Sequence, residues 1–296
     1  MRFLLLFAMA PGCTFVLYDE QCDTAAVQVA EDTGAEPDLL WASLGAGSIH
    51  SCGIDPDGLI SCWGGNPEGQ LDAPEGTFDA LAIGHAHSCA LDSDNQVSCW
   101  GRNTEGQNDL SGVFTALSAG GAHTCGLDSD GGVVCVGRND EGQTDVPEGT
   151  FVSIAAGWSH TCAVSTEDTV FCWGSIDSPR LDAPVLSIES GQGFSCGLDA
   201  TGSISCWGEG AIADVSTDSG FTELAAGAKH LCARAGDGMV ECWGDNAAGQ
   251  LDAPNVPVHG LVSGAGSLHS CAVDGADADV GFAHCWGLDA EKQLAP

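Results

Sequence analysis

The stretch Ala86-His87-Ser88-Cys89-Ala90-Leu91-Asp92-Ser93-Asp94-Asn95-Gln96-Val97-Ser98-Cys99-Trp100-Gly101 occurs in seven versions along this 296-residue chain. Its invariant part is a pair of cysteines, usually preceded by Gly-x-x-His and followed by Trp-Gly. The pairs are Cys52/Cys62, Cys89/Cys99, Cys125/Cys135, Cys162/Cys172, Cys196/Cys206, Cys232/Cys242 and Cys271/Cys285. Self-similarity at a period of about 20–50 residues indicates a solenoid or a propeller.

Each version predicts a β-hairpin that opposes its two cysteines. In the second unit we expect strands at 78–84, 87–91 and 97–100, with a turn at 92–95 that is rich in the Asp and Asn such turns require. Directly opposed residues of a non-hydrogen-bonded pair have Cα atoms about 4.5 Å apart, within reach of a disulfide. The pattern favours seven disulfides, one per unit and none between units, over buried free thiols. Each bridge is expected to contribute about 2–3 kcal/mol.

Both faces of these hairpins carry small or apolar side chains. The residue after each first cysteine is Ala or Gly, which we interpret as room for the tryptophan diagonally across. A sheet covered on both faces by similar sheets is typical of blades stacked radially. We place the units at 41–77, 78–113, 114–150, 151–184, 185–220, 221–257 and 258–296.

The charge balance restricts the partners. The chain carries 42 acidic and only 7 basic residues, for a net charge of −35. Nucleic acids and anionic membranes require clustered cations, so neither is expected as a partner. Self-repulsion favours a soluble monomer, and a partner with a basic face is the alternative to a merely solvated surface. The Asp-x-Asp-Gly turns resemble the start of a calcium loop but lack its closing Glu, and the Cys spacing does not suit zinc. We therefore expect no metal and no cofactor.

The N-terminus resembles a bacterial export signal. Residues 1–12 hold one Arg, a short apolar run and small residues, and they are too short to span a bilayer. Cleavage after Ala10 would follow Ala8-Met9-Ala10, whereas Ala10-Pro11-Gly12-Cys13 resembles a lipobox. We favour lipidation of Cys13, with residues 13–40 as a flexible acidic tether on the outer membrane or cell surface. The alternatives are a secreted protein or a bridge between Cys13 and Cys22.

The repeat resembles that of the regulator of chromosome condensation family. The shared elements are Gly-x-x-His-Ser/Thr-Cys, Val-x-Cys-Trp-Gly and Asn-x-x-Gly-Gln, the last at 66–70, 103–107, 139–143 and 246–250. The resemblance implies an all-β fold, a single seven-bladed β-propeller with short blades of three or four antiparallel strands. Units this short resemble those of the bacterial β-lactamase inhibitor protein II more than the longer eukaryotic ones. Val136 replaces the Trp of the third unit, Phe194 replaces the His of the fifth, and the fourth and fifth units lack Asn-x-x-Gly-Gln.

Three functions of different kinds are open at this stage. The favoured one is an exported, non-catalytic propeller that binds a protein or glycan ligand on one rim. An inhibitor of a secreted hydrolase is the second, by analogy of fold alone, and a secreted lyase or glycosidase is the third. No catalytic triad, nucleophile elbow or phosphate loop is present in the sequence, so we expect no enzyme. Nucleotide exchange on a small GTPase, the family's known activity, conflicts with the charge and the export signal.

Ligand-binding residues are expected where the units differ at equivalent positions. One such set is the pair inside each Gly-x-x-His, which includes His85, Trp158, Gln192 and Lys229. Trp158 serves either as an interface anchor or as packing between blades. A second set follows Trp-Gly, where Arg102 and Arg138 either neutralise nearby Asp or grip a ligand carboxylate. The repeat histidines are interpreted as structural groups, with a metal- or substrate-binding ring as the alternative; they are His50, His87, His123, His160, His230 and His269.

Overall fold

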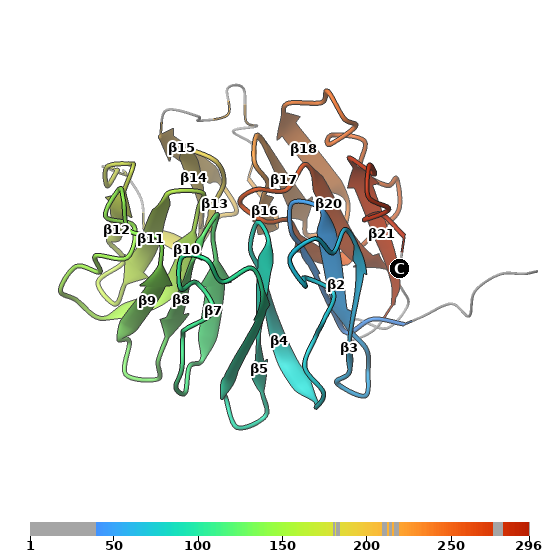
Figure 1. The fold of residues 1–296 in the computed structure, drawn as a ribbon. Helices are drawn as coiled ribbons and strands as arrows, with labels where there is room; N and C mark the ends of the chain where they lie inside the picture. Colours follow the sequence, from blue (N-terminus) through green and yellow to red (C-terminus); the bar gives the residue numbers. More distant parts are fainter. Residues whose placement is uncertain are drawn as a thin grey trace, which may run out of the picture. The chain divides into compact units, whose positions relative to one another are not determined.

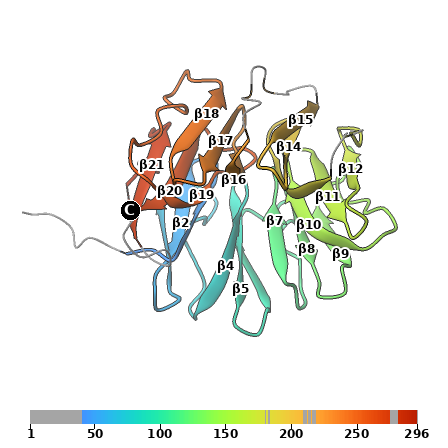
Figure 2. The same cartoon turned by 180° about the vertical axis from the view of Figure 1, so that it is seen from behind.

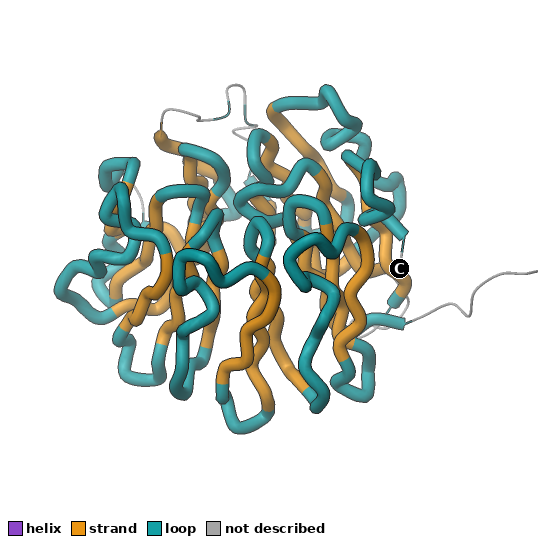
Figure 3. The backbone as a smooth tube through the Cα atoms, in the orientation of Figure 1, coloured by secondary structure: helices purple, strands orange, loops and turns teal. Residues whose placement is uncertain are grey.

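The regular structure of this chain is entirely β-strand in the part described by the computed structural model, residues 40–179, 181, 184–208, 212, 215, 219–274 and 281–295 (Figure 1, Figure 3). Seven sheets of three antiparallel strands each follow one another in chain order. The export signal, the tether, Cys13, Cys22 and the tip of the seventh hairpin lie outside the described residues.

The strands are β1 (Ser43–Ala46), β2 (His50–Ile54), β3 (Ile60–Gly64), β4 (Phe78–Ile83), β5 (His87–Asp92), β6 (Val97–Gly101), β7 (Ala116–Ala119), β8 (His123–Leu127), β9 (Val133–Gly137), β10 (Phe151–Ala156), β11 (His160–Ser165), β12 (Val170–Gly174), β13 (Val185–Ser190), β14 (Phe194–Asp199), β15 (Ile204–Gly208), β16 (Phe221–Ala226), β17 (His230–Ala235), β18 (Val240–Gly244), β19 (His259–Val262), β20 (His269–Asp274) and β21 (Phe282–Gly287). The three strands expected in the second unit are confirmed as β4, β5 and β6. Blades 1 to 7 are numbered here in the same order.

The hairpin register confirms the predicted disulfides. The two cysteines of each hairpin lie directly opposite each other, on the second and third strands of every blade. Their Cα atoms are 4.0–4.1 Å apart, and each pair is bonded. The bonds are Cys52–Cys62, Cys89–Cys99, Cys125–Cys135, Cys162–Cys172, Cys196–Cys206, Cys232–Cys242 and Cys271–Cys285. Every disulfide therefore closes its own blade, including the last one, whose cysteines are four residues further apart.

The two cysteines of a bond differ in burial. The first cysteine of each pair, on the second strand, is fully buried. The second cysteine is only partly buried in every blade, as at Cys62, Cys135 and Cys242. This corrects the expectation that neighbouring sheets cover the whole hairpin on both faces, because the third strand is the outer edge of each three-stranded sheet. The alternative of buried free thiols is also wrong, since all fourteen cysteines of the units are bonded.

In blades 1, 2, 3 and 5 an aspartate organises the hairpin turn by accepting hydrogen bonds from turn amides, and in blade 4 Ser165 takes this role. In blade 2 the Asp92 Oδ1 atom accepts hydrogen bonds from the amides of Asp94 and Gln96, both at 2.9 Å. Asn95 then adopts a left-handed φ of 60°, and Gly58 takes the equivalent place in blade 1 with a φ of 84°. Asn and Gly tolerate this region best, which explains the composition of the turns. The acidic side chains accept these bonds as part of the turns.

The ring closes on itself within the described residues. The first strand of each sheet contacts the first strand of the next, and β1 contacts β19. Both views place the blue first sheet beside the red last one (Figure 1, Figure 2). Trp41 pairs with Gly281 through two backbone hydrogen bonds, and the Gln293 carbonyl accepts Trp63 Nε1 at 2.9 Å. The N-terminal and C-terminal parts of the ring are thus joined to each other.

The core consists of apolar layers between adjacent blades. Trp100 of blade 2 packs on Cys52 and Ile54 of blade 1, and Trp63 of blade 1 packs on Cys271 of blade 7. Each such Trp covers the disulfide of the preceding blade. The tryptophan of the Cys-Trp-Gly motif therefore belongs to the apolar layer between two blades. The small residue after each first cysteine makes room for a different side chain than we expected. A Cβ at Gly53 would meet the ring of Trp41, at the start of the unit, and one at Gly126 would meet Phe114.

Candidate functional site

The repeat histidines link each blade to the next. The Nε2 atom of a histidine at the start of a second strand contacts a Ser or Thr hydroxyl on the second strand of the following blade. We call these contacts the latches. Six are present: His50–Ser88 (2.9 Å), His87–Thr124 (2.8 Å), His123–Thr161 (2.9 Å), His160–Ser195 (2.9 Å), His230–Ser270 (2.7 Å) and His269–Ser51 (2.8 Å).

The latch histidines are neutral. Thr124 donates its one proton to the Gln107 carbonyl at 2.8 Å, so it accepts from His87, whose proton is therefore on Nε2. All six rings are fully buried, and this desolvation lowers the pKa of His87 to about 3 and that of His160 to about 4. The close fit also explains the first glycine of Gly-x-x-His, because a Cβ at Gly84 would clash with the His87 ring. These histidines hold the blades together.

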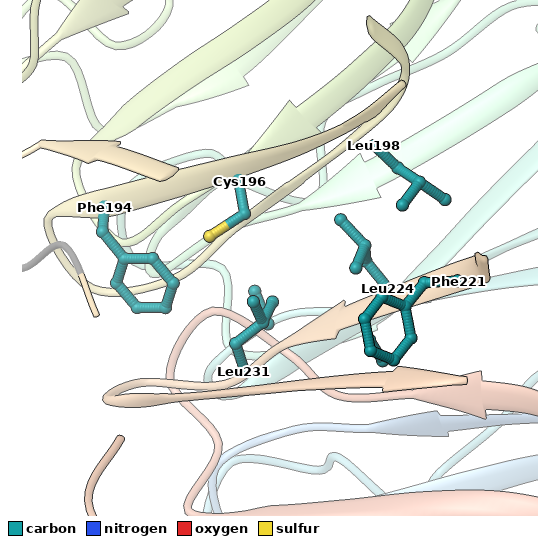
Figure 4. Packing of buried hydrophobic residues seen from close by; sticks show 8 residues of the cluster. Phe194, Cys196, Leu198, Phe221, Leu224 and Leu231 are labelled. Carbon is teal, nitrogen blue, oxygen red and sulfur yellow. The ribbon is translucent and has the colours of Figure 1, made fainter. Parts of the chain in front are cut away.

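The junction between blades 5 and 6 has no polar latch. Phe194 stands where the other blades have His, and Leu231 of blade 6 stands where they have Ser or Thr. Both side chains are fully buried and belong to one apolar cluster (Figure 4). Phe in place of the His alone would leave a buried hydroxyl without its partner, and Leu in place of the Ser or Thr alone would leave a buried imidazole without one. Either loss costs about 1–3 kcal/mol. The replacement of both avoids that cost. Sequence comparison between units detects Phe194, but only the contact reveals why Leu231 accompanies it.

The two residues inside each Gly-x-x-His form one continuous rim, which we call the axial rim. A chain of backbone hydrogen bonds runs from turn to turn: Ser48 N–His85 O, His85 N–Gly120 O, Gly121 N–Gly157 O, Trp158 N–Gly191 O, Gln192 N–Ala228 O and Ala228 N–Ser267 O, at 2.7–3.2 Å. The residues of the axial rim are 48–49, 85–86, 121–122, 158–159, 192–193, 228–229 and 267–268. Because the backbone makes these bonds, the side chains can differ between blades without breaking the ring.

Trp158 spans the axial rim between distant blades. Its ring lies against His85 of blade 2 at a centroid distance of 4.7 Å, in an edge-to-face arrangement of 69°. A Cβ at Gly266 of blade 7 would meet both the Trp158 ring at 2.8 Å and His85 Nδ1 at 3.0 Å. Turns from blades 2, 4 and 7 therefore converge at Trp158, which stays half-buried. Of the residues predicted as a binding surface, the structure brings His85 and Trp158 into contact.

The remaining predicted residues lie on the same side of the ring. Gln192 and Lys229 are exposed members of the axial rim. The Arg102 backbone amide donates to the Ala86 carbonyl at 2.9 Å, so the residue that follows Trp-Gly in blade 2 is bonded to the axial rim. Burial lowers the pKa of His85, and the positive charge of Arg102 lowers it further. Arg138 is paired with Asp140 of its own loop at 2.8 Å.

A carboxylate that the sequence reasoning missed lines the space inside the ring. Glu189 of β13 borders a cavity of about 150 Å³ formed by residues of blades 2, 3, 4, 5 and 7. Burial, with the neighbouring Glu223, raises the pKa of Glu189 to about 8. A comparison of equivalent first-strand positions would have found it, since the other blades have only small or apolar residues there.

The regulator of chromosome condensation (RCC1) repeat family matches four stretches of the chain, residues 78–107, 114–143, 151–177 and 221–250. These stretches contain the Gly-x-x-His and Cys pairs that form the latches and disulfides. The chain is therefore a β-propeller in which four stretches match the RCC1 repeat. No curated protein matches the RCC1-repeat propeller in sequence.

Several solved structures share the fold of this RCC1-repeat propeller. The ectodomain of the receptor kinase CR4 from Physcomitrella patens is 25% identical, with a TM-score of 0.69, 84% of this chain covered and 74% of that one. The CRINKLY WD40 ectodomain of the Arabidopsis thaliana receptor kinase ACR4 is 24% identical, with a TM-score of 0.69 and 85% and 98% covered. Yeast RCC1 (Prp20), solved with Kap60, is 19% identical, with a TM-score of 0.61 and 75% and 73% covered.

The disulfides bear on where the RCC1-repeat propeller works. Seven pairs are bonded in the described residues, and disulfides persist in extracellular and secreted proteins. They indicate an extracellular or secreted protein. Within the residues that the structure describes, no helix has the length and apolar character needed to cross a membrane.

Proposed function

We propose that this RCC1-repeat propeller is an exported, non-catalytic binding protein whose axial rim receives a protein or glycan ligand. The observation that carries the proposal is the axial rim itself. Its backbone is bonded from blade to blade, while its side chains differ at every blade and include half-buried Trp158 and exposed Gln192 and Lys229. A rigid scaffold with variable, partly exposed side chains is the usual construction of a binding surface, and tryptophan is a favoured anchor residue.

The extracellular setting is supported by the seven bonded cysteine pairs and by the N-terminal export pattern. Two similar structures are ectodomains of receptor kinases, so propellers of this type occur outside cells. We extend the proposal to a lipid anchor at Cys13 on a bacterial envelope. A Cys13→Ser variant is expected to leave the membrane fraction for the soluble one. Unchanged fractionation would remove the anchor from the proposal without affecting the axial rim.

The binding proposal is tested by capture of ligands from envelope extract and by arrays of glycans, followed by titration of the captured ligand. Trp158→Ala is expected to weaken binding more than tenfold, because it removes the largest side chain of the axial rim. Lys229→Ala, at an exposed position, is expected to weaken it with no loss of stability. The matched control is Trp243→Ala, which removes a half-buried tryptophan that packs on Phe221 between blades.

The result that would overturn the binding proposal is equal affinity of the wild-type, Trp158→Ala and Lys229→Ala proteins for the captured ligand. Hydrolysis or elimination of glycans or peptides by the purified protein would instead establish an enzyme. If the captured ligand is a secreted hydrolase whose activity the propeller blocks, the same rim belongs to an inhibitor. Activity assays on the captured ligand separate these outcomes.

A further inference from the structure

One position in the ring breaks the pattern of small side chains inside it. The first-strand residue opposite each first cysteine is Gly45, Ala82, Ser118, Ala155, Glu189, Ala225 or Val262. Six of the seven are small or apolar. The seventh places a carboxylate among strands whose neighbouring positions, Ala155 of blade 4 and Ala225 of blade 6, offer it no polar group.

The cavity beside Glu189 is lined by oxygen acceptors and methyl groups. Its volume of about 150 Å³ holds several water molecules, and so a small organic group. Besides Glu189 its polar side chains are Ser118, Ser190 and Ser263. The Ser263 hydroxyl donates to the His269 carbonyl at 3.0 Å, and Ser118 accepts from the Ala156 amide at 2.8 Å. Hydroxyl oxygens retain further lone pairs after such bonds, so these serines can accept from a donor inside the cavity.

Glu189 lacks a cationic partner among the described residues. Arg234 of the neighbouring blade is already paired, because its Nε donates to Glu223 at 2.9 Å. Among the described residues, none donates a hydrogen bond to the Glu189 carboxylate or forms a salt bridge with it. Glu223, on β16, is the titratable group that acts on Glu189, and its negative charge adds to burial in raising the pKa of Glu189 to about 8. A cation in the cavity would supply the missing partner.

We propose that the cavity inside the ring binds a primary ammonium group, with Glu189 as its counter-ion and the serine hydroxyls as further acceptors. The chemistry of the lining selects this class. Ca²⁺ needs six to eight oxygen ligands and usually several carboxylates, whereas the described lining of this cavity has one carboxylate. Quaternary ammonium ions are bound by aromatic cages, and no aromatic residue is among the described lining residues. An ammonium donates three hydrogen bonds, which a carboxylate and hydroxyls can accept. The site is independent of the ligand taken by the axial rim.

The sign of the pH dependence follows from the charge states. The ammonium binds the ionised form of Glu189, so its binding lowers the apparent pKa of this carboxyl. At a free ligand concentration ten times the dissociation constant, the titration midpoint falls by about one unit. The test uses the full propeller labelled with ¹³C at the glutamate side-chain carboxyl carbons, titrated by NMR with methylammonium chloride at constant ionic strength. Glu189→Gln identifies the resonance, and Glu105→Gln identifies an exposed control glutamate.

We expect methylammonium at ten times its dissociation constant to lower the Glu189 midpoint by about one unit and to leave Glu105 unchanged. Tetramethylammonium has the same charge without N–H donors and is expected to have less than a tenth of that effect. Methylammonium should also raise the melting temperature of the wild type but not that of the folded Glu189→Gln variant. The proposal is overturned if Glu189 and Glu105 respond alike, or if both cations act equally, because either result would mean diffuse attraction to an acidic protein.

Discussion

The junction between blades 5 and 6 and the other six junctions solve the same packing problem with opposite chemistry. At six junctions a neutral histidine bonds a hydroxyl of the next blade, whereas Phe194 and Leu231 fill the equivalent space without a polar atom. In the latches the histidine Nε2 atom and the facing hydroxyl are paired, and at the apolar junction neither of these two polar groups is present. This contrast indicates that the two positions are coupled, because a change at one of them alone leaves a buried polar group without its partner.

The same region differs in a second way. Gln70 is the last residue of the Asn-x-x-Gly-Gln segment of blade 1. Its backbone carbonyl accepts a hydrogen bond from Trp100 Nε1 of the next blade at 2.8 Å. Blade 4 lacks this segment, and Trp207 of blade 5 donates instead to Cys172 Sγ at 3.4 Å. Trp207 and Trp243 are half-buried, whereas Trp100 is 7% exposed. The blades around the apolar junction therefore depend less on polar contacts between repeats.

The largest expected effect is acid destabilisation through the six latches. A histidine that titrates near pH 6.5 unfolded and near 3 or 4 folded contributes full stability above about pH 6.5, and this is lost as the pH falls because only the unfolded state binds the proton. The cost is about 1 kcal/mol per histidine at pH 5.5, or roughly 6–8 kcal/mol for six. Denaturant unfolding between pH 7.5 and 5.5 measures it. A flat profile would contradict the buried neutral state.

The next largest effect is expected at the apolar junction. Leu231→Ser removes a buried side chain and places a hydroxyl opposite Phe194, for a loss of about 4 kcal/mol. Phe194→His together with Leu231→Ser should recover at least about 2 kcal/mol of this, because the pair recreates a latch. The double variant should also add a seventh titrating histidine to the acid profile. Losses that simply add in the double-mutant cycle would show that the two positions are independent.

A comparison of two disulfides tests whether a blade at the apolar junction depends more on its disulfide for stability than a blade joined to its neighbours by latches. The Cys89–Cys99 and Cys196–Cys206 bonds both have a sequence separation of 10. The chain-entropy effect predicts a loss of about 3 kcal/mol when either pair is replaced by alanine. Calorimetry of the two double variants is expected to agree within about 0.5 kcal/mol. A clearly greater loss in blade 5 would mean that the apolar junction relies more on its disulfide.

The smallest effect concerns the tryptophan contacts. Trp100→Phe leaves the Gln70 carbonyl without its donor, whereas Trp207→Phe removes a bond to sulfur, which is a weak acceptor. Trp100 is also more deeply buried than Trp207, so the difference between the variants combines the lost hydrogen bond with the larger buried ring area lost at Trp100. We expect Trp100→Phe to cost about 1 kcal/mol more than Trp207→Phe in denaturant unfolding. Equal losses would assign the role of Trp100 to packing alone.

The features that depend on near neighbours in the chain could be predicted from the sequence. A hairpin whose turn is built on Asp92 and Asn95 has one register, and that register opposes Cys89 to Cys99 whatever surrounds it. The disulfides, the three strands of each blade and their repetition follow from such local patterns. The RCC1 motifs then indicated a propeller, because they recur at a constant interval.

The residues that meet across the ring could be identified only from the folded structure. His50 reaches Ser88, 38 positions away, and His85 meets Trp158 from two blades further on, because the twist and stacking of the sheets bring them together. Local periodicity contains no information about that stacking, so the partnership of Phe194 with Leu231 and the isolation of Glu189 were not predicted. Each depends on the space left between blades, and that space exists only once the ring has closed.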